Sequence, residues 1–401
     1  MSGPPASGWW LASDGRWYPP EAWAPVPPAA PAAPHPPDRP GGREPRRAIG
    51  VLVGLIVVLA VVAVALPLVA EVHHPGATRR PTGAPIVPFR RINVPTYPPG
   101  CPSAAPGHPA STRVPMDVVR SGTFIWEFVP VCIDGRGPYP FILDTGAAGS
   151  LVDAALARAI GLPTTARADR ARGVNDCSAA ASVSRIAAWA LGPVPLAAQE
   201  VQTVAVPFFG ARDAPAGLLG SDVLARFGTV RLDFSSHVLL LGGREGPVGA
   251  DRSVAGTGDR SAVPRALTGT GPFTPVPMSV VVRDGYVRPL VDVHIAGSDH
   301  PFVLDTGAGT SAVDREFAAV VSLAGTGRRE VISGVACTIA VPIVGSGRWA
   351  IGPVRLGPRP MPDVSLGPIG ASGLLGSDEL TRFGWIVLDY RRGELLLGPG
   401  R

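Results

Sequence analysis

The sequence predicts an all-β protein made of two similar lobes, and three observations support this prediction. Four short blocks of sequence occur twice in the same order. Short apolar runs between them are bounded by Gly, Asp and Ser, a pattern typical of β-strands. The chain also holds 50 Gly and 47 Pro among its 401 residues, which favours turns over long helices. Two copies are too few for a solenoid, so we expect a pseudo-dimer.

Residues 1–47 differ in composition from the rest of the chain. Trp and Tyr gather in residues 9–18, and Pro-rich sequence follows to residue 40. The Trp-rich stretch resembles a short motif found at the cytoplasmic N-termini of actinobacterial membrane proteins, and this motif implies no particular chemistry. We expect a cytoplasmic tail, in which a small docking element and a merely adhesive segment both stay open.

Residues 48–70 form an uncharged and almost wholly apolar run, and a helix needs about 20 residues to span a bilayer. We predict a transmembrane helix, because no polar face interrupts the run as it would in a buried core helix. Residues 63–65 have the small-x-small pattern of a cleaved signal peptide, but the long segment before the run favours an uncleaved signal-anchor. By the positive-inside rule, the N-terminus is cytoplasmic, because four arginines precede the run: Arg39, Arg43, Arg46 and Arg47.

The part of the chain after this run is expected to be extracytoplasmic. Residues 71–112 are rich in Pro, Gly and Arg, which predicts a semi-rigid stalk. All four cysteines follow the run: Cys101, Cys132, Cys177 and Cys337. An even number of cysteines on one side fits an oxidising compartment, with free buried thiols as the alternative. Neither the cysteines nor the histidines have the spacing of metal ligands, so we predict no metal site.

The repeated blocks divide the remaining chain into repeat 1 (residues 113–242), a Gly/Ser/Arg-rich linker (243–274) and repeat 2 (275–401). The blocks are Val-Pro-Met at 114–116 and 276–278, Pro-Phe-(Ile/Val)-Leu-Asp-Thr-Gly-Ala at 140–147 and 301–308, Trp-Ala-(Leu/Ile)-Gly-Pro-Val at 189–194 and 349–354, and Gly-Leu-Leu-Gly-Ser-Asp at 217–222 and 373–378. We expect one helix after each Asp-Thr-Gly, at 153–160 and 314–321, and a shorter one at 223–227 and 379–383. Asp222 and Asp378 are predicted to cap the shorter helices.

The pairing of Asp-Thr-Gly-Ala with a downstream Gly-Leu-Leu-Gly resembles the aspartic proteases, and more closely their retropepsin-like branch. The resemblance covers both repeats and implies a two-lobed acid-protease fold. It also implies that Asp144 and Asp305 form a catalytic dyad, which activates a water for peptide hydrolysis without a cofactor. Two carboxylates that share one proton can accept the proton of the water and donate a hydrogen bond to the peptide carbonyl.

The same resemblance assigns supporting roles to the neighbouring residues. Thr145 and Thr306 are expected to form a hydroxyl network between the lobes. Gly146 and Gly307 are expected to let backbone N–H groups approach the carboxylates, which a Cβ would hinder. Ala follows each motif where pepsin-type enzymes often have a hydroxyl residue. The loss of that donor raises the expected pKa of the dyad and predicts activity at mildly acidic to neutral pH.

The resemblance also implies two flaps, which are hairpins that cover the substrate. The candidate flap tips at 172–178 and 333–338 contain Gly173, Cys177, Gly334 and Cys337. The two cysteines lie at matching positions, so one hypothesis joins Cys177 to Cys337 across the flaps and pins the stalk through a second bond, Cys101–Cys132. Four cysteines allow three pairings, and the sequence does not choose among them.

These observations predict a membrane-anchored extracytoplasmic aspartic endopeptidase whose dyad forms within one chain and whose substrate is an extended peptide or protein. The alternative is a catalytically silent envelope module that binds a peptide or a partner through the same fold. A third possibility pairs each repeat with its twin in another chain. Nucleic-acid binding is not expected, because the net charge is only +5 and the arginines form no basic stripe.

Overall fold

The structure is a computed structural model, and it describes residues 10–11, 17–18, 86–87, 93–101, 111–206, 214–243, 245–246, 251–256, 265–268, 271–335 and 337–400. The chain divides into two compact units, Met1–Arg80 and Pro81–Arg401. In the first unit, the strands β1 (Trp10–Leu11) and β2 (Trp17–Tyr18) pair antiparallel within the Trp-rich stretch.

The predicted membrane helix at 48–70 lies outside the described residues. Within the described part of the chain, no helix is both long enough and apolar enough to cross a bilayer.

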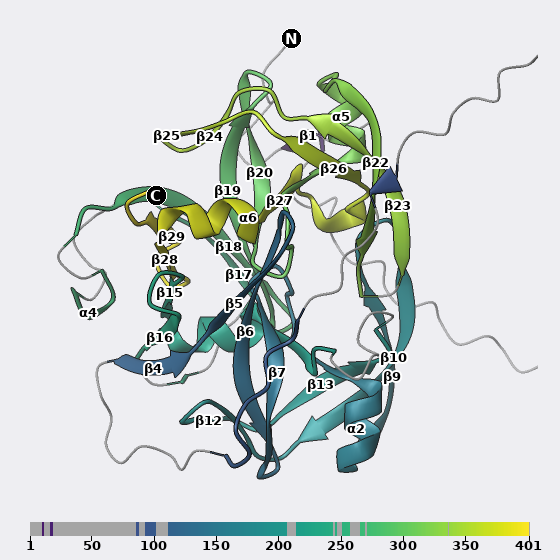
Figure 1. The fold of residues 1–401 in the computed structure, drawn as a ribbon, viewed down its shortest axis with the longest axis vertical. Helices are drawn as coiled ribbons and strands as arrows, with labels where there is room; N and C mark the ends of the chain where they lie inside the picture. The colour runs from purple at the N-terminus through teal and green to yellow at the C-terminus, as the bar shows by residue number, and fades with distance from the viewer. Residues whose placement is uncertain are drawn as a thin grey trace, which may run out of the picture. The chain divides into compact units, whose positions relative to one another are not determined.

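The unit Pro81–Arg401 is built mostly of strands, as predicted (Figure 1). Repeat 1 contains β5 (Asp117–Ser121), β6 (Phe124–Ile133), β7 (Arg136–Asp144), β8 (Leu151–Asp153), β9 (Thr164–Arg172), β10 (Ser178–Ile186), β11 (Trp189–Leu191), β12 (Val194–Leu196), β13 (Gln199–Val204) and β14 (Gly217–Gly220). Their order in the sheet is β12-β11-β6-β7-β14-β8-β13-β10-β9, and β5 pairs with β6.

Repeat 2 forms its strands in the same succession. They are β18 (Thr274–Arg283), β19 (Tyr286–Ile295), β20 (Ser298–Asp305), β21 (Ala312–Asp314), β22 (Gly325–Ser333), β23 (Thr338–Gly345), β24 (Trp349–Ile351), β25 (Val354–Leu356), β26 (Pro360–Val364) and β27 (Gly373–Gly376). The pairings match as well, since β7 lies parallel to β14 and β20 lies parallel to β27. This arrangement is consistent with the predicted two-lobed fold.

Strands from both repeats join in one further sheet. Its members are β4 (Ser111–Pro115), β16 (Val238–Gly242), β15 (Thr229–Asp233), β28 (Trp385–Asp389) and β29 (Glu394–Leu397), followed by the start of β18. The centre of this sheet is the antiparallel pair β15–β28, one strand from each repeat. A continuous apolar core connects the repeats as well, and its largest fully buried side chains include Phe141, Phe227, Phe302 and Tyr390.

The predicted helices are present, and their caps differ from the prediction in one respect. α2 (Ala154–Ile160) and α5 (Arg315–Val320) begin after Asp153 and Asp314, whose carboxylates cap the helix N-termini. The shorter helices are α3 (Ser221–Leu224) with η2 (Ala225–Phe227), and α6 (Ser377–Leu380) with η4 (Thr381–Phe383). The N-cap residues of α3 and α6 are Gly220 and Gly376, without a side-chain cap, so the prediction that Asp222 and Asp378 cap them was wrong.

The described parts of the stalk and linker also pair with the two repeats. β3 (Ile86–Val87) lies parallel to β22, and β4, at the end of the predicted stalk, pairs with β16. In the linker, β17 (Arg252–Ala255) pairs with β18, and α4 (Arg265–Thr268) forms a single helical turn. A separate 3₁₀ helix, η3 (Gly367–Ile369), lies in repeat 2. The described linker is therefore partly structured rather than a plain tether.

Candidate active site

Asp144 and Asp305, the predicted catalytic residues, lie at equivalent strand ends. β7 ends at Asp144 and β20 at Asp305. Each strand is paired with a Gly-Leu-Leu-Gly strand, so that Asp144 lies opposite Gly220 and Asp305 opposite Gly376. The strand pairing thus fixes the position of each Asp at the end of its strand. The two carboxyl groups form a side-chain hydrogen bond with each other.

Thr145 and Thr306 connect the two loops, in agreement with the role that the resemblance implies. The Thr145 amide donates to Thr306 Oγ1 at 3.1 Å, and the Thr306 amide donates to Thr145 Oγ1 at 3.0 Å. The hydroxyls donate in turn to the opposite strand, from Thr145 Oγ1 to Leu304 O at 2.7 Å and from Thr306 Oγ1 to Leu143 O at 2.5 Å. Both threonines are fully buried, so these bonds hold the dyad loops together away from water.

Replacing Thr306 with Val is expected to lower the free energy of unfolding by about 2–4 kcal/mol. The change leaves the buried Thr145 N–H and Leu143 carbonyl without their partner, and an unpaired buried polar group costs more than a hydrogen bond contributes. Denaturant unfolding measures the loss. Thr306→Ser keeps the hydroxyl and is the matched control, so equal stabilities of the two variants would contradict this account of the loop contact.

Gly146 and Gly307 lie where no side chain fits. A Cβ on Gly146 would overlap the Asp305 carboxylate, and a Cβ on Gly307 would overlap the Asp144 carboxylate. Neither residue has a positive φ, so the requirement for glycine comes from space and not from backbone conformation. Both backbone amides donate hydrogen bonds toward Asp144, as the prediction of a close backbone approach requires.

Burial raises the pKa of both dyad carboxyls, and the charge of Asp144 raises that of Asp305 further. For Asp144, which is only 8% exposed, burial raises the pKa, while hydrogen bonds from the backbone oppose the rise. For Asp305, burial and then the charge of Asp144 raise the pKa well above its usual range. The Ala147 and Ala308 amides donate to the two carboxyls at 2.7 and 2.9 Å. A pair with these surroundings retains one shared proton, because two adjacent carboxylates cannot both ionise easily.

Asp222 and Asp378 fix the shape of the loops instead of capping helices. Ser150 Oγ donates to Asp222 Oδ1 at 2.7 Å, and Ser311 Oγ donates to Asp378 Oδ1 at 2.7 Å. Each serine also accepts a hydrogen bond from the last glycine of the Gly-Leu-Leu-Gly strand, at 2.9 and 3.0 Å. A distant serine therefore binds each aspartate carboxylate, which the local sequence predicted to cap a short helix.

Two buried residues that contact the supports of the dyad loops were not predicted from the sequence. Glu127 and Tyr390 are buried, and each contacts a serine that follows a Gly-Leu-Leu-Gly strand, Ser377 and Ser221 respectively. For Glu127 the sequence does hold a signal, since it is the one charged residue in the apolar strand β6. Its contact with Ser377 joins residues 250 positions apart, which no local pattern indicates.

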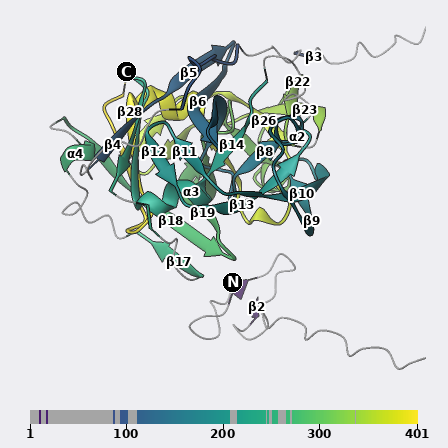
Figure 2. The same ribbon diagram turned by 90° about the horizontal axis from the view of Figure 1, so that it is seen from below.

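The flap candidates form two hairpins, β9–β10 and β22–β23, which lie on the same side of the unit in both views (Figures 1 and 2). A disulfide joins Cys177 to Cys337 at their tips, and a second joins Cys101 to Cys132, so the structure selects the hypothesised pairing. The amides of Gly173 and Gly334 donate to the carbonyls of Cys177 and Cys337 at 2.8 and 2.9 Å, which closes each turn.

Gly173 and Gly334 allow the two flap tips to pack closely, and neither adopts a left-handed backbone conformation. A Cβ on Gly173 would lie 3.2 Å from Val335 N, and one on Gly334 would lie 3.4 Å from Val174 Cγ2. In the first flap the positive φ angles, 60° and 55°, belong to Asn175 and Asp176. The two tips therefore contact each other closely as well as through the disulfide.

Each flap tip also contacts the opposite repeat. Val174 packs against the apolar cluster of repeat 2, and Val335 packs against that of repeat 1. The Asn175 amide donates to Ser365 O at 2.5 Å, and the Ser365 amide donates to Asn175 Oδ1 at 2.9 Å. These contacts and the disulfide hold the flaps in a closed arrangement, which we call the closed roof.

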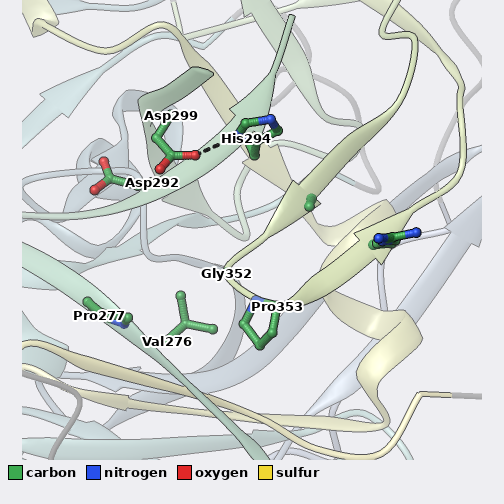
Figure 3. Close-up of a pocket in the computed structure, with 9 residues that line it drawn as sticks. Val276, Pro277, Asp292, His294, Asp299, Gly352 and Pro353 are labelled. Carbon is green, nitrogen blue, oxygen red and sulfur yellow. Dashed lines mark hydrogen bonds and ion pairs between the residues drawn. The ribbon is translucent and has the colours of Figure 1, made fainter. Parts of the chain in front are cut away.

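A cavity of about 600 Å³ lies elsewhere, on repeat 2 (Figure 3). Its lining includes Val276, Pro277, Asp292 and a hydrogen-bonded pair, His294 and Asp299, whose Nδ1 and Oδ1 atoms are 2.8 Å apart. Neither dyad residue lines it. Among the residues that the structure describes, no three His, Cys, Asp or Glu side chains are grouped to hold a metal ion.

Comparison with known proteins gives one family match. A family model described as aspartyl protease matches residues 129–223, a segment that includes Asp144 and the first Gly-Leu-Leu-Gly strand. Over this segment the chain is similar to aspartyl proteases. No curated protein matches the chain.

Three solved structures that match this chain share little sequence with it. The crystal structure of edgp is 8% identical, with a TM-score of 0.38, and the match covers 73% of this chain and 95% of that one. Conglutin gamma, a basic 7S globulin from lupine seeds, is 10% identical, with a TM-score of 0.40 and coverages of 73% and 95%. Basic 7S globulin from soybean is 11% identical, with a TM-score of 0.36 and coverages of 72% and 94%.

Proposed function

We propose that the chain is an aspartic endopeptidase, a hydrolase that cleaves peptide bonds with a water activated by Asp144 and Asp305. The observation that carries the proposal is the dyad itself: two hydrogen-bonded carboxyls, one from each repeat, on loops that Thr145 and Thr306 hold together. The aspartyl-protease match over residues 129–223 supports it. No cofactor is needed, because the dyad supplies both the acid and the base.

The different surroundings of the two carboxyls suggest how they divide the work. Asp305 has the more strongly raised pKa, so it holds the shared proton and donates a hydrogen bond to the peptide carbonyl oxygen. Asp144, which receives more backbone hydrogen bonds, is the carboxylate that accepts the proton of the attacking water. The proton of Asp305 passes to the carbonyl oxygen as the tetrahedral intermediate forms. The intermediate then collapses: Asp144 gives the proton that it took from the water to the leaving nitrogen, the C–N bond breaks, and Asp305 takes back a proton from a hydroxyl of the intermediate.

The raised pKa values predict activity at mildly acidic to neutral pH. Below the lower pKa of the pair both carboxyls are protonated and the base is lost. Above the upper pKa both are ionised and the acid is lost. Because burial raises both values, the whole window between them moves upward. A profile of kcat/KM against pH measures the window, and a maximum below about pH 3 would contradict the prediction.

The direct test of the proposal is cleavage of a diverse peptide library by the purified chain across acidic to neutral pH, with products read by mass spectrometry. We expect cuts within extended peptides and a consistent preference around the cut bond. Complete absence of cuts, from folded protein with the flap disulfide both intact and reduced, would overturn the endopeptidase proposal.

A second candidate function is a catalytically silent module that binds a peptide or partner. The closed roof favours this candidate, because a disulfide links the two flaps covalently. The intact dyad favours the endopeptidase, since binding alone needs neither carboxylate. Stable capture of library peptides without cleavage would identify the binding module.

We further propose that the chain is anchored by residues 48–70, with Pro81–Arg401 outside the cytoplasm. The apolar run, the preceding arginines and the two disulfides support this arrangement. We also propose that one chain supplies the whole dyad, which the β15–β28 pairing within the chain supports. Protease protection in intact cells tests the first proposal, and the mass of the particle in solution tests the second.

A further inference from the structure

Two serine hydroxyls support the dyad loops from below. Ser221 Oγ donates to Thr145 O at 2.7 Å, and Ser377 Oγ lies 3.1 Å from Thr306 O. Both serines are fully buried. The two carbonyls belong to the residues directly after the catalytic aspartates. The position of each catalytic loop therefore depends on a serine that gives its one hydrogen to that carbonyl.

Each serine is also contacted by a polar side chain from the other repeat. The Tyr390 hydroxyl lies 3.0 Å from Ser221 Oγ, and Glu127 Oε2 lies 2.5 Å from Ser377 Oγ. Tyr390 is 1% exposed and Glu127 is fully buried. The two serines occupy equivalent places in the repeats, but their partners differ: a phenol directly after β28 for Ser221 and a carboxyl on β6 for Ser377.

The two serines differ in the number of hydrogens available for their hydrogen bonds. A neutral phenol can donate to Ser221, which leaves the serine hydrogen free for Thr145 O. An ionised Glu127 can only accept, so Ser377 would give its hydrogen to Glu127, and Thr306 O would lose its donor. A protonated Glu127 can instead donate through Oε2 to Ser377, whose hydrogen then reaches Thr306 O. Only this second state gives both loops the same support.

We propose that Glu127 is a protonated carboxylic acid in the native protein and a positioning residue that, through Ser377, holds the loop carrying Asp305. The role in catalysis rests on the proposed endopeptidase function, whereas the protonation state does not. No bond is made or broken at Glu127 during turnover. It maintains a chain of two hydrogen bonds that ends at Thr306 O.

The surroundings of Glu127 fit this state. Its other oxygen, Oε1, has no hydrogen-bond partner among the described residues, and an ionised oxygen left in this way would be costly. Burial raises the pKa of Glu127 to about 8. Two charged groups act on it: Arg120 on β5, which is exposed and lowers the pKa, and Asp378 on α6, which raises it. Asp378 already has an ion pair with Arg359 and hydrogen bonds from Ser311.

Infrared difference spectroscopy of the wild-type chain against Glu127→Gln tests the protonation state directly. The amide keeps the shape and a donor, so the variant is expected to fold. We expect the difference at pH 6 to contain the carbonyl band of a protonated carboxyl, which converts to a carboxylate band with a midpoint near pH 8. A carboxylate band already present at pH 6 would overturn the proposal. The readout needs no enzymatic activity, so its failure is distinct from failure of the endopeptidase proposal.

The positioning role is tested by comparing Glu127→Gln, Glu127→Leu and Tyr390→Phe. Leu removes the donor beneath Asp305, and Phe removes the matching donor beneath Asp144, so each is expected to lower kcat about tenfold with little change in KM. Gln is expected to retain kcat and thus to rescue the loss caused by Leu. Equal kcat values for Gln and Leu would overturn the positioning role. If the Leu variant does not fold, a Gln variant with kcat as low as that of Tyr390→Phe overturns it instead, and a wild-type kcat in the Gln variant supports it.

Discussion

Peptide cleavage is expected to fall at least about 10³-fold when either Asp144 or Asp305 is replaced by Asn, a loss of the size that removal of a general acid or base produces. An amide cannot accept the proton of the attacking water or exchange the shared proton of the dyad. Because both carboxyls act on one water, each single substitution should remove nearly all of the activity. The measurement is kcat/KM on a peptide found in the library, at the pH of maximal activity.

The control for this prediction is another substitution of a buried carboxylate by its amide. Asp153 caps α2 through hydrogen bonds to the Ala155 and Leu156 amides, and Asn caps helices about as well as Asp. Asp153→Asn should therefore keep both activity and stability. Appreciable cleavage by Asp144→Asn or Asp305→Asn, with folding unchanged, would exclude a single dyad as the catalytic centre.

Opening the closed roof is the second large effect that we expect. Replacing Cys177 and Cys337 with Ser frees the flap tips, so peptides should reach the dyad more readily and kcat/KM should rise. The same change should lower the free energy of unfolding by about 5 kcal/mol, because the bond links residues separated by 160 positions and limits the unfolded chain. Activity and stability are thus predicted to move in opposite directions.

The second disulfide provides the matched comparison. Cys101–Cys132 spans 31 positions and does not involve the flaps. Its removal should cost about 4 kcal/mol of stability while leaving kcat/KM unchanged. If both double variants cleave peptides at the wild-type rate, the closed roof does not control access to the dyad, and the flaps must open in some other way.

The parts of the site that lie in short repeated motifs could be predicted from the sequence. Asp144 and Thr145 are neighbours in one motif, Asp305 and Thr306 in the other, and the resemblance of both motifs to those of aspartic proteases implied that they meet. Asp153 and Asp314 were expected at the start of helices, where each carboxylate reaches its own backbone within a few residues. These features depend on local geometry and on a symmetry that is visible in the sequence.

The remaining features depend on contacts between distant residues. Asp222 has the local pattern of a cap, but Ser150, 72 positions away, binds its carboxylate. The cysteine pairing stayed open because spacing alone allows three solutions. Neither Glu127 nor Tyr390 lies in a repeated block, so the comparison of the two repeats does not reveal them. Their roles follow only from the partners that folding brings to them.

The strand pair β15–β28 has a consequence for how the native state is reached. The sheet around it contains β4 from the start of repeat 1, β15 and β16 from its end, and β28 and β29 from the end of repeat 2. Its central pair therefore closes only after nearly the whole of Pro81–Arg401 has been synthesised. Until then β15 presents an edge with unpaired backbone groups, which is prone to pair with other chains. Late closure of long-range pairs also slows folding. Pairing with β28 of repeat 2 is therefore what covers this edge of repeat 1.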